Sequence, residues 1–293
     1  KINTMKKIIL LGLSILCFSY SSLGQFGDIS SKQLAVLKNS KLLVVKSGSD
    51  VLDSLVQYSM EESWDFIPYE IVSHEEAKNH YGDEKYSFLT FVSYDAYSEG
   101  KWIKFTNLVL LLTNKKDKKK NKLNFVGNKL AYLLLDNSRS WKEEGDQTFF
   151  YKWNDLFKGF TNFLKLADSN GGMSLRDLGK HYMKNKEELK SHTLLIEPSQ
   201  LNREMKEDTS LLAEVYLFEY ELVSHAAIYS AIKDVNADYA YVYSAPASSR
   251  NFTMIIECGT GRILLIDMAG SYAGAVPNKL YPRFIKILMA NFR

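Results

Sequence analysis

The sequence has little cysteine and little proline, and each low content excludes a class of protein. Cys17 and Cys258 are the only cysteines among 293 residues. Because Cys17 lies in an N-terminal apolar segment, removal of that segment would leave Cys258 alone and exclude an internal disulfide. Only five prolines interrupt the chain, and 46% of the residues are hydrophobic. This composition is typical of a globular protein held by packed cores rather than of a disordered or disulfide-stapled one.

Long apolar runs are also missing. The longest, Ile8–Phe18, follows Lys6-Lys7 and has 11 residues, well short of the roughly 20 that a membrane-spanning helix needs. The small residues of Ser22-Leu23-Gly24 then suit a signal peptidase that cuts before Gln25. The pattern predicts a signal peptide.

We place this signal peptide at residues 1–24, with Met5 as the start of translation. The predicted location is the periplasm, the outer envelope or the extracellular space. A membrane anchor and lipid attachment at Cys17 are the alternatives. Leu16 disfavours lipid attachment, which requires a small residue before the cysteine.

Net charge of one sign is absent once the predicted signal peptide is set aside. The chain holds 37 basic and 34 acidic residues, and residues 1–24 contain three lysines and no acid, which leaves 34 of each. A neutral protein has no overall field to attract nucleic acid or to steer acidic substrates. We therefore expect no nucleic-acid partner.

An internal repeat runs through the remainder at a spacing of about 150 residues. Tyr69–His74 recurs as Tyr220–His225, with five identities in six positions at an offset of 151. The same offset aligns Leu43–Val45 with Leu194–Ile196. The order of such matches is kept along the chain, which predicts two copies of one module.

Each copy predicts the same order of elements: strand, helix, strand, helix, three strands and a helix. The fold class is therefore α/β, with two tandem β-α-β-α-β-β-β-α modules, each a mixed sheet covered by helices. We place copy 1 at residues 28–168, a short flexible linker at 169–173 and copy 2 at 174–293. The elements expected in copy 1 are the strands Lys41–Lys46, Phe66–Val72, Tyr86–Ser93, Phe105–Leu112 and Leu130–Asp136 and the helices Asp50–Glu62, Glu75–His80 and Phe149–Leu166. Those of copy 2 are the strands Thr193–Glu197, Phe218–Val223, Tyr239–Ser244, Phe252–Cys258 and Ile263–Met268 and the helices Arg203–Tyr216, Ala226–Val235 and Lys279–Phe292.

The largest difference between the copies is an insertion. Asn114–Lys122 stands in copy 1 where copy 2 has the short turn Cys258–Arg262. Insertions collect in exposed loops, so we expect this segment at a hairpin tip. Its six lysines are candidates for contact with an anionic surface, such as a membrane surface or lipopolysaccharide. They are Lys115, Lys116, Lys118, Lys119, Lys120 and Lys122. A solvated tip is the alternative, and no aromatic residues among the lysines support stacking on nucleobases.

Candidate catalytic groups are few. His74 and His225 follow Ser73 and Ser224, but adjacent residues at a helix start point apart, which favours serine N-caps over a Ser–His pair. No histidine spacing matches a metal-binding motif. Gly259–Gly261 leads into a strand, which indicates a hairpin turn rather than a phosphate loop. We therefore expect no metal and no cofactor.

Four carboxylates keep an enzymatic alternative open, a hydrolase that acts on an envelope polymer. Glu70 and Glu221 occupy equivalent strand positions, and Asp136 and Asp267 end equivalent strands. Such a pair in a cleft between the modules would suit acid and base catalysis. Solvent-facing residues on the wet side of a sheet are the other interpretation.

Part of copy 2 resembles known modules of bacterial envelope proteins. Strand Tyr220–Val223, helix Ala226–Val235 and the following Ala237-Asp238-Tyr239 are similar to the small α/β domains of the TolB amino-terminal, CsgG and LpoB-type families. The resemblance covers about 25 residues. The chain lacks the TolB propeller and the CsgG lipobox cysteine, so no functional residue is carried over.

This resemblance implies a non-catalytic module that binds other proteins. The Leu-Gly-Gln ending of the predicted signal peptide and the tyrosine-rich strands also resemble secreted proteins of the Bacteroidetes. The function expected from the sequence is a non-enzymatic envelope binding or scaffold protein whose partner is another envelope protein.

Overall fold

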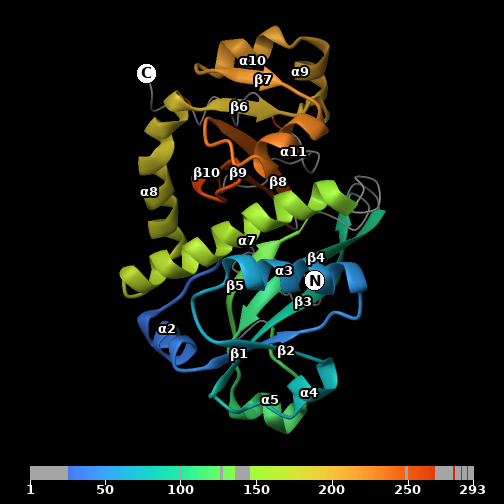
Figure 1. Cartoon of the computed structure of the whole chain (residues 1–293), viewed down its shortest axis with the longest axis vertical. Coiled ribbons are helices and arrows are strands. Elements are labelled where there is room, and N and C mark those ends of the chain that lie inside the picture. The colour runs from blue at the N-terminus through green and yellow to red at the C-terminus, as the bar shows by residue number, and fades with distance from the viewer. Residues whose placement is uncertain are drawn as a thin grey trace, which may run out of the picture.

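The structure is a computed structural model. It describes residues 26–98, 101–125, 128–135, 146–247 and 250–267, together with Leu280, Ile285 and Met289. Two five-stranded mixed sheets covered by helices confirm the predicted α/β class with two tandem modules (Figure 1). The predicted signal peptide and Asp136 lie outside the described residues.

Module 1 has the strand order β2-β1-β3-β4-β5. Its first three strands are parallel, and β4 and β5 join antiparallel. Its strands are β1 (Lys41–Val45), β2 (Tyr69–Val72), β3 (Tyr86–Ser98), β4 (Lys101–Leu111) and β5 (Lys129–Leu134). Its helices are α2 (Ser31–Lys38), α3 (Asp50–Ser63), α4 (His74–Lys78), α5 (Lys115–Lys120) and α7 (Asp146–Ser169).

Module 2 has the order β7-β6-β8-β9-β10, which places equivalent strands in the same positions. Its strands are β6 (Thr193–Ile196), β7 (Tyr220–Leu222), β8 (Tyr239–Ala247), β9 (Arg250–Glu257) and β10 (Ile263–Asp267). Its helices are α8 (Leu175–Asn185), η1 (Lys186–Ser191), η2 (Pro198–Gln200), α9 (Arg203–Glu207), α10 (Ser210–Val215) and α11 (His225–Lys233). The common topology agrees with a repeat, whose origin by duplication stays a prediction.

Strand register corrects one detail of the repeat. Leu42 lies opposite Tyr69, and Leu194 lies opposite Tyr220. The equivalent of Leu194 is therefore Leu42 rather than Leu43, because the connection to the second strand is one residue shorter in module 2.

One further prediction about module 2 was wrong. The single helix expected over Arg203–Tyr216 is broken, because Asp208 accepts hydrogen bonds from the backbone N–H and the hydroxyl of Ser210, at 3.0 and 2.6 Å, and such local bonds compete with a helix. Met173, at the end of the predicted linker 169–173, pairs with Ile29 as an antiparallel bridge. Within the expected last helix, the described Ile285 and Met289 are helical and buried.

Helix α7 joins the two modules. It packs against α3 on one side and α11 on the other (Figure 1). Its Trp153, Phe157 and Phe160 are fully buried, as a helical stripe of aromatic residues leads one to expect. The hydrophobic core around them also includes Ile228 and Ile256 of module 2, so it is continuous from one module to the other.

The modules therefore stack end to end. The short β9–β10 turn faces α7 of module 1, whereas α5 lies at the opposite end of module 1 (Figure 1). In the part of the chain that the structure describes, no helix has the length and apolar character needed to cross a bilayer.

Candidate functional site

The junction between the modules is held by polar contacts from one face of α7. The Lys158 ammonium donates to the carbonyl oxygen of Gly259 at 2.7 Å, and the Gly259 N–H donates to Asp155 Oδ2 at 2.9 Å. Gly159 lets the turn approach, since a Cβ there would lie 3.0 Å from the carbonyl oxygen of Gly261. Gly259 and Gly261 both have positive φ, which confirms the predicted hairpin turn.

Asp155 is the most perturbed carboxyl of this junction. Its side chain is buried, and its Oδ1 has no hydrogen-bond partner among the described residues. Burial raises the pKa of Asp155 to about 7, although the Gly259 N–H and the Lys158 ammonium lower it. Because the turn covers it, Asp155 cannot meet a substrate. We interpret it as part of the contact between modules.

A second polar cluster lies where β6 and β7 end, the edge at which α/β sheets commonly bind ligands. Glu197 Oε2 lies 3.0 Å from His225 Nδ1, and the Lys152 ammonium of α7 lies 3.2 Å from the same nitrogen. The Ser199 hydroxyl donates to Glu197. The hydrogen bond with His225 is the main cause that lowers the pKa of Glu197 to about 2.

These contacts fix α7 on module 2. Ser199 donates to Glu197, whose lowered pKa makes it a weak base, whereas a nucleophilic serine needs a base that takes its proton. Ser73 and Ser224 accept from the N–H groups of Glu76 and Ala227, which confirms their predicted role as N-caps. This cluster was not predicted from the sequence, because Lys152 belongs to the other module and lies far from Glu197 and His225 along the chain.

Of the carboxylates of the hydrolase alternative, Glu70 and Glu221 do not come together. Glu70 and Glu221 lie on β2 and β7, the outer strands of different sheets, and both are exposed. Glu70 forms an ion pair with Lys41 at 2.7 Å. Of Asp267 the structure gives only its place in β10.

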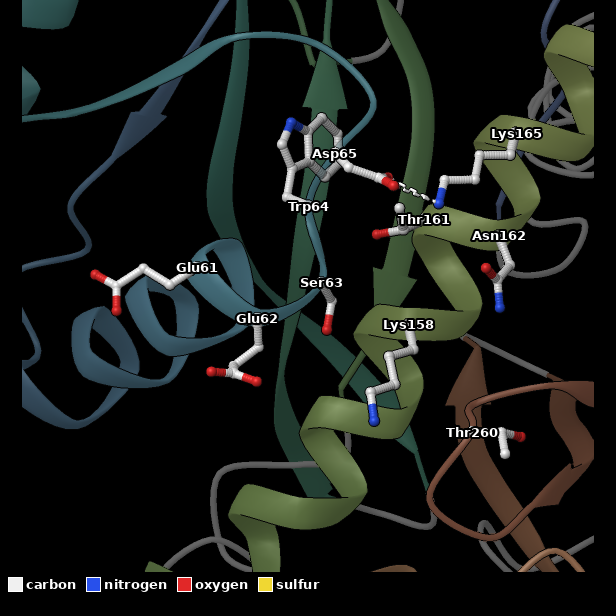
Figure 2. Close-up of a pocket in the computed structure, with 10 residues that line it drawn as sticks. All are labelled: Glu61, Glu62, Ser63, Trp64, Asp65, Lys158, Thr161, Asn162, Lys165 and Thr260. Atoms are coloured by element: carbon white, nitrogen blue, oxygen red, sulfur yellow. Dashed lines mark hydrogen bonds and ion pairs between the residues drawn. The ribbon is translucent and has the colours of Figure 1, made fainter. Parts of the chain in front are cut away.

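A cavity of about 320 Å³ lies between the end of α3, helix α7 and the β9–β10 turn (Figure 2). Its acidic residues come from the α3 end and its lysines from α7. They are Glu61, Glu62, Asp65, Lys158 and Lys165. Lys165 pairs with Asp65 at 2.8 Å, and Figure 2 shows the Glu61 side chain directed away from α7. The cavity is an open, mixed-charge groove rather than a preorganised carboxylate pair.

A second cavity of about 360 Å³ lies at the end of β1, and apolar residues line it together with Lys46, Asp50, Asp53, Ser54 and Gln57. The loop that follows β1 directs backbone N–H groups inward, but a side chain of the protein itself accepts their hydrogen bonds. Asp53 accepts from the N–H groups of Ser47 and Gly48, at 2.6 and 3.3 Å. Among the residues described, no group of three His, Cys, Asp or Glu side chains is placed to hold a metal ion.

The lysine segment forms helix α5, where we expected only a hairpin tip. The sequence carries the signal for it, a capping box in which the Asn114 side chain accepts from the Lys116 N–H and Asp117 binds back to the Asn114 N–H. Asn121 then ends the helix with a left-handed backbone, φ 48°. The inserted segment is therefore an ordered element.

Asp117 anchors α5 to the body of module 1. Its side chain is 1% exposed and accepts hydrogen bonds from four neighbouring residues. The donors are the Thr113 hydroxyl at 3.2 Å, the Asn114 N–H at 2.9 Å, the Asn124 N–H at 3.0 Å and the Asn128 amide at 2.5 Å. Gly82 lies against the helix, since a Cβ there would lie 2.5 Å from Lys118 Cβ.

The six candidate lysines are all exposed. None of their ammonium groups forms an ion pair within the described part of the chain. The structure thus gathers five of the predicted residues on one short helix at the end of module 1, with Lys122 just after it (Figure 1). Their charge is available to a partner.

Comparisons with known proteins found no match among family models, curated proteins or solved structures.

Proposed function

We propose that this chain is an exported, non-enzymatic binding protein of the cell envelope that docks on an anionic lipid surface through α5. The observation that carries the proposal is the buried Asp117, which holds a helix with five exposed lysines and a sixth, Lys122, just after it, none of them in an ion pair with a described residue. A merely solvated tip needs no buried anchor, whereas a docking surface benefits when its charges are held in place before binding.

The charge on α5 is sufficient for such docking. A lysine near an anionic membrane contributes about 1 kcal/mol, so six lysines acting together support a useful affinity. The attraction is electrostatic and falls off over about 8 Å at physiological ionic strength. Binding is therefore expected to weaken as salt rises.

The remaining surface supports a binding role rather than catalysis. The polar groups at the end of β1 form hydrogen bonds within that loop, and those at the ends of β6 and β7 bond to each other. The candidate carboxylates Glu70 and Glu221 lie on separate sheets. Docking through α5 leaves module 2 accessible to another envelope protein, the partner that we expect.

Vesicle co-sedimentation tests the proposal. We expect the protein to bind vesicles that contain phosphatidylglycerol and not vesicles of phosphatidylcholine alone. Replacement by glutamine of the five lysines within α5 should weaken binding by about a hundredfold or more at low salt. These are Lys115, Lys116, Lys118, Lys119 and Lys120.

The matched control removes the same charge from scattered places. It replaces by glutamine five exposed lysines outside α5, namely Lys32, Lys46, Lys184, Lys206 and Lys233. This variant should keep most of the affinity. Equal loss in both variants, or no binding by the wild type at low salt, would contradict the proposal.

A further inference from the structure

Among the described residues, the two ends of the molecule carry opposite charge. Helix α5 lies at one end of the long axis, and α9, α10 and β7 lie at the other (Figure 1). The segment 203–221 at this far end holds two basic residues, Arg203 and Lys206, against six exposed acids. The acids are Glu204, Glu207, Asp208, Glu214, Glu219 and Glu221.

The repeat itself shows how the acidic end arises. In module 1 the edge-strand residue Glu70 is neutralised by Lys41 of the neighbouring strand. Register places Thr193 at the position of Lys41, because Lys41 lies opposite Tyr86 and Thr193 lies opposite Tyr239. Glu221 consequently has no ion-pair partner among the residues that the structure places.

The flank formed by α3, one of those between the two ends, is also acidic. Helix α3 presents exposed Asp50, Glu61 and Glu62, whereas Asp65 after the helix is paired with Lys165. A molecule that lay on this flank would bring these carboxylates against anionic lipid. Only the α5 end offers a surface with more positive than negative charge among the faces formed by α3, α5 and segment 203–221.

We infer that the chain docks end-on on an anionic phospholipid bilayer, with α5 at the membrane and the acidic end of module 2 facing away. The inference rests on the proposed function and adds the orientation and the surface left for a partner. The lipid attracts α5 and repels segment 203–221, and because these lie at opposite ends of the long axis, both forces turn the α5 end toward the membrane. The outward end suits a partner with basic residues.

Three variants that each remove two acids measure the orientation. The membrane-proximal variant is Asp83→Asn with Glu84→Gln, next to Gly82, which contacts α5. The flank variant is Glu61→Gln with Glu62→Gln, and the distal variant is Glu219→Gln with Glu221→Gln. All six side chains are exposed, so each pair changes charge without opening a core.

The proximal variant should bind phosphatidylglycerol vesicles several-fold to about tenfold more tightly than the wild type, because it removes two repulsive charges near the lipid. The flank and distal variants should stay within about twofold, because their carboxylates lie beyond the screening length. Neutron reflectometry should show a protein layer as thick as the long axis of the molecule.

Equal tightening by the distal or flank pair, or a layer as thin as the short axis, would overturn end-on docking while leaving lipid binding intact. Absence of vesicle binding by the wild type would instead overturn the proposed function and the orientation with it. Binding to a soluble polyanion without binding to vesicles would assign α5 to another class of partner and also overturn the inference.

Discussion

The two modules share a strand order but differ in the connection between their last two strands. In module 2 this connection is a short turn whose backbone docks on α7, with Gly259 bonded to Asp155 and Lys158. In module 1 it is helix α5, which faces solvent with its lysines. The same place in the fold thus joins the modules in one case and is available to a partner in the other.

A buried aspartate holds each connection in place, and the two aspartates differ in the number of hydrogen bonds that they accept. Asp117 accepts four hydrogen bonds, whereas Asp155 accepts one and leaves its Oδ1 without a partner within the described chain. A buried polar group is costly when it lacks partners. Substitution at these two residues should therefore have opposite effects.

The largest effect is expected at the turn of module 2. Gly261 has φ +67°, and a Cβ there would lie 2.4 Å from the carbonyl oxygen of Asp155. Gly261→Val should lower the free energy of unfolding by about 3–5 kcal/mol, because the clash separates the turn from α7. Denaturant unfolding measures it.

Gly171→Val is the matched control. Gly171 has a similar φ of +65°, and a Cβ there would meet no neighbouring atom of the described chain within 4 Å. It should lose only about 1–2 kcal/mol from the left-handed backbone. Equal losses of unfolding free energy in the two variants would show that the turn does not pack against α7.

Asp155→Asn should stabilise the protein above pH 7. The pKa of Asp155 is raised by burial to about 7, so the folded state holds a proton that the unfolded state releases near pH 4. Stability from this residue is present below pH 4 and is lost as the pH rises to 7. Asparagine removes the charge and can still accept from the Gly259 N–H.

The gain should reach about 2–4 kcal/mol above pH 7 and vanish near pH 4. Unfolding measured from pH 4 to pH 9 for wild type and variant gives the difference curve. A difference that does not change with pH would refute the titration of Asp155 in this range.

Asp117→Asn should destabilise the protein by about 1–3 kcal/mol at pH 7. The amide keeps one acceptor oxygen where the carboxylate has two. If that oxygen takes the place of Oδ2, which accepts three of the four hydrogen bonds, the NH₂ group faces the Asn124 N–H. Thermal unfolding measures the loss. A stabilising effect, like that expected at Asp155, would contradict the contrast between the two aspartates.

The smallest effect is expected from the lysines themselves. Replacement of the five α5 lysines by glutamine should change stability by a few tenths of a kcal/mol, as exposed substitutions usually do. A loss above about 1 kcal/mol would show that the lysines stabilise the fold and would weaken their assignment to a partner.

Local patterns predicted the elements and their caps. Strand alternation placed both sheets, and Ser73 and Ser224 were identified as N-caps because the signal lies within four residues. The break at Asp208 was missed, since helical periodicity continued across it. The sequence contains the capping box of Asn114 and Asp117, but the many lysines of this segment indicated an exposed loop instead of a helix.

The contacts of α7 with module 2 could not be predicted. Lys152 and Asp155 meet His225 and Gly259 through the stacking of the two modules, and residues so far apart in sequence share no local pattern. The six lysines could be identified as a group because charge clustering is a property of the sequence alone, and their contact with an anionic surface stays a prediction. Their anchor, Asp117, required the structure.

Hydrogen–deuterium exchange of the protein bound to phosphatidylglycerol vesicles tests the central claim most directly. We expect slower exchange than in the free protein in peptides that cover α5 and the adjoining turn at Gly82, and unchanged exchange in peptides from segment 203–221. Protection of segment 203–221 without protection of α5 would contradict docking through the lysine helix.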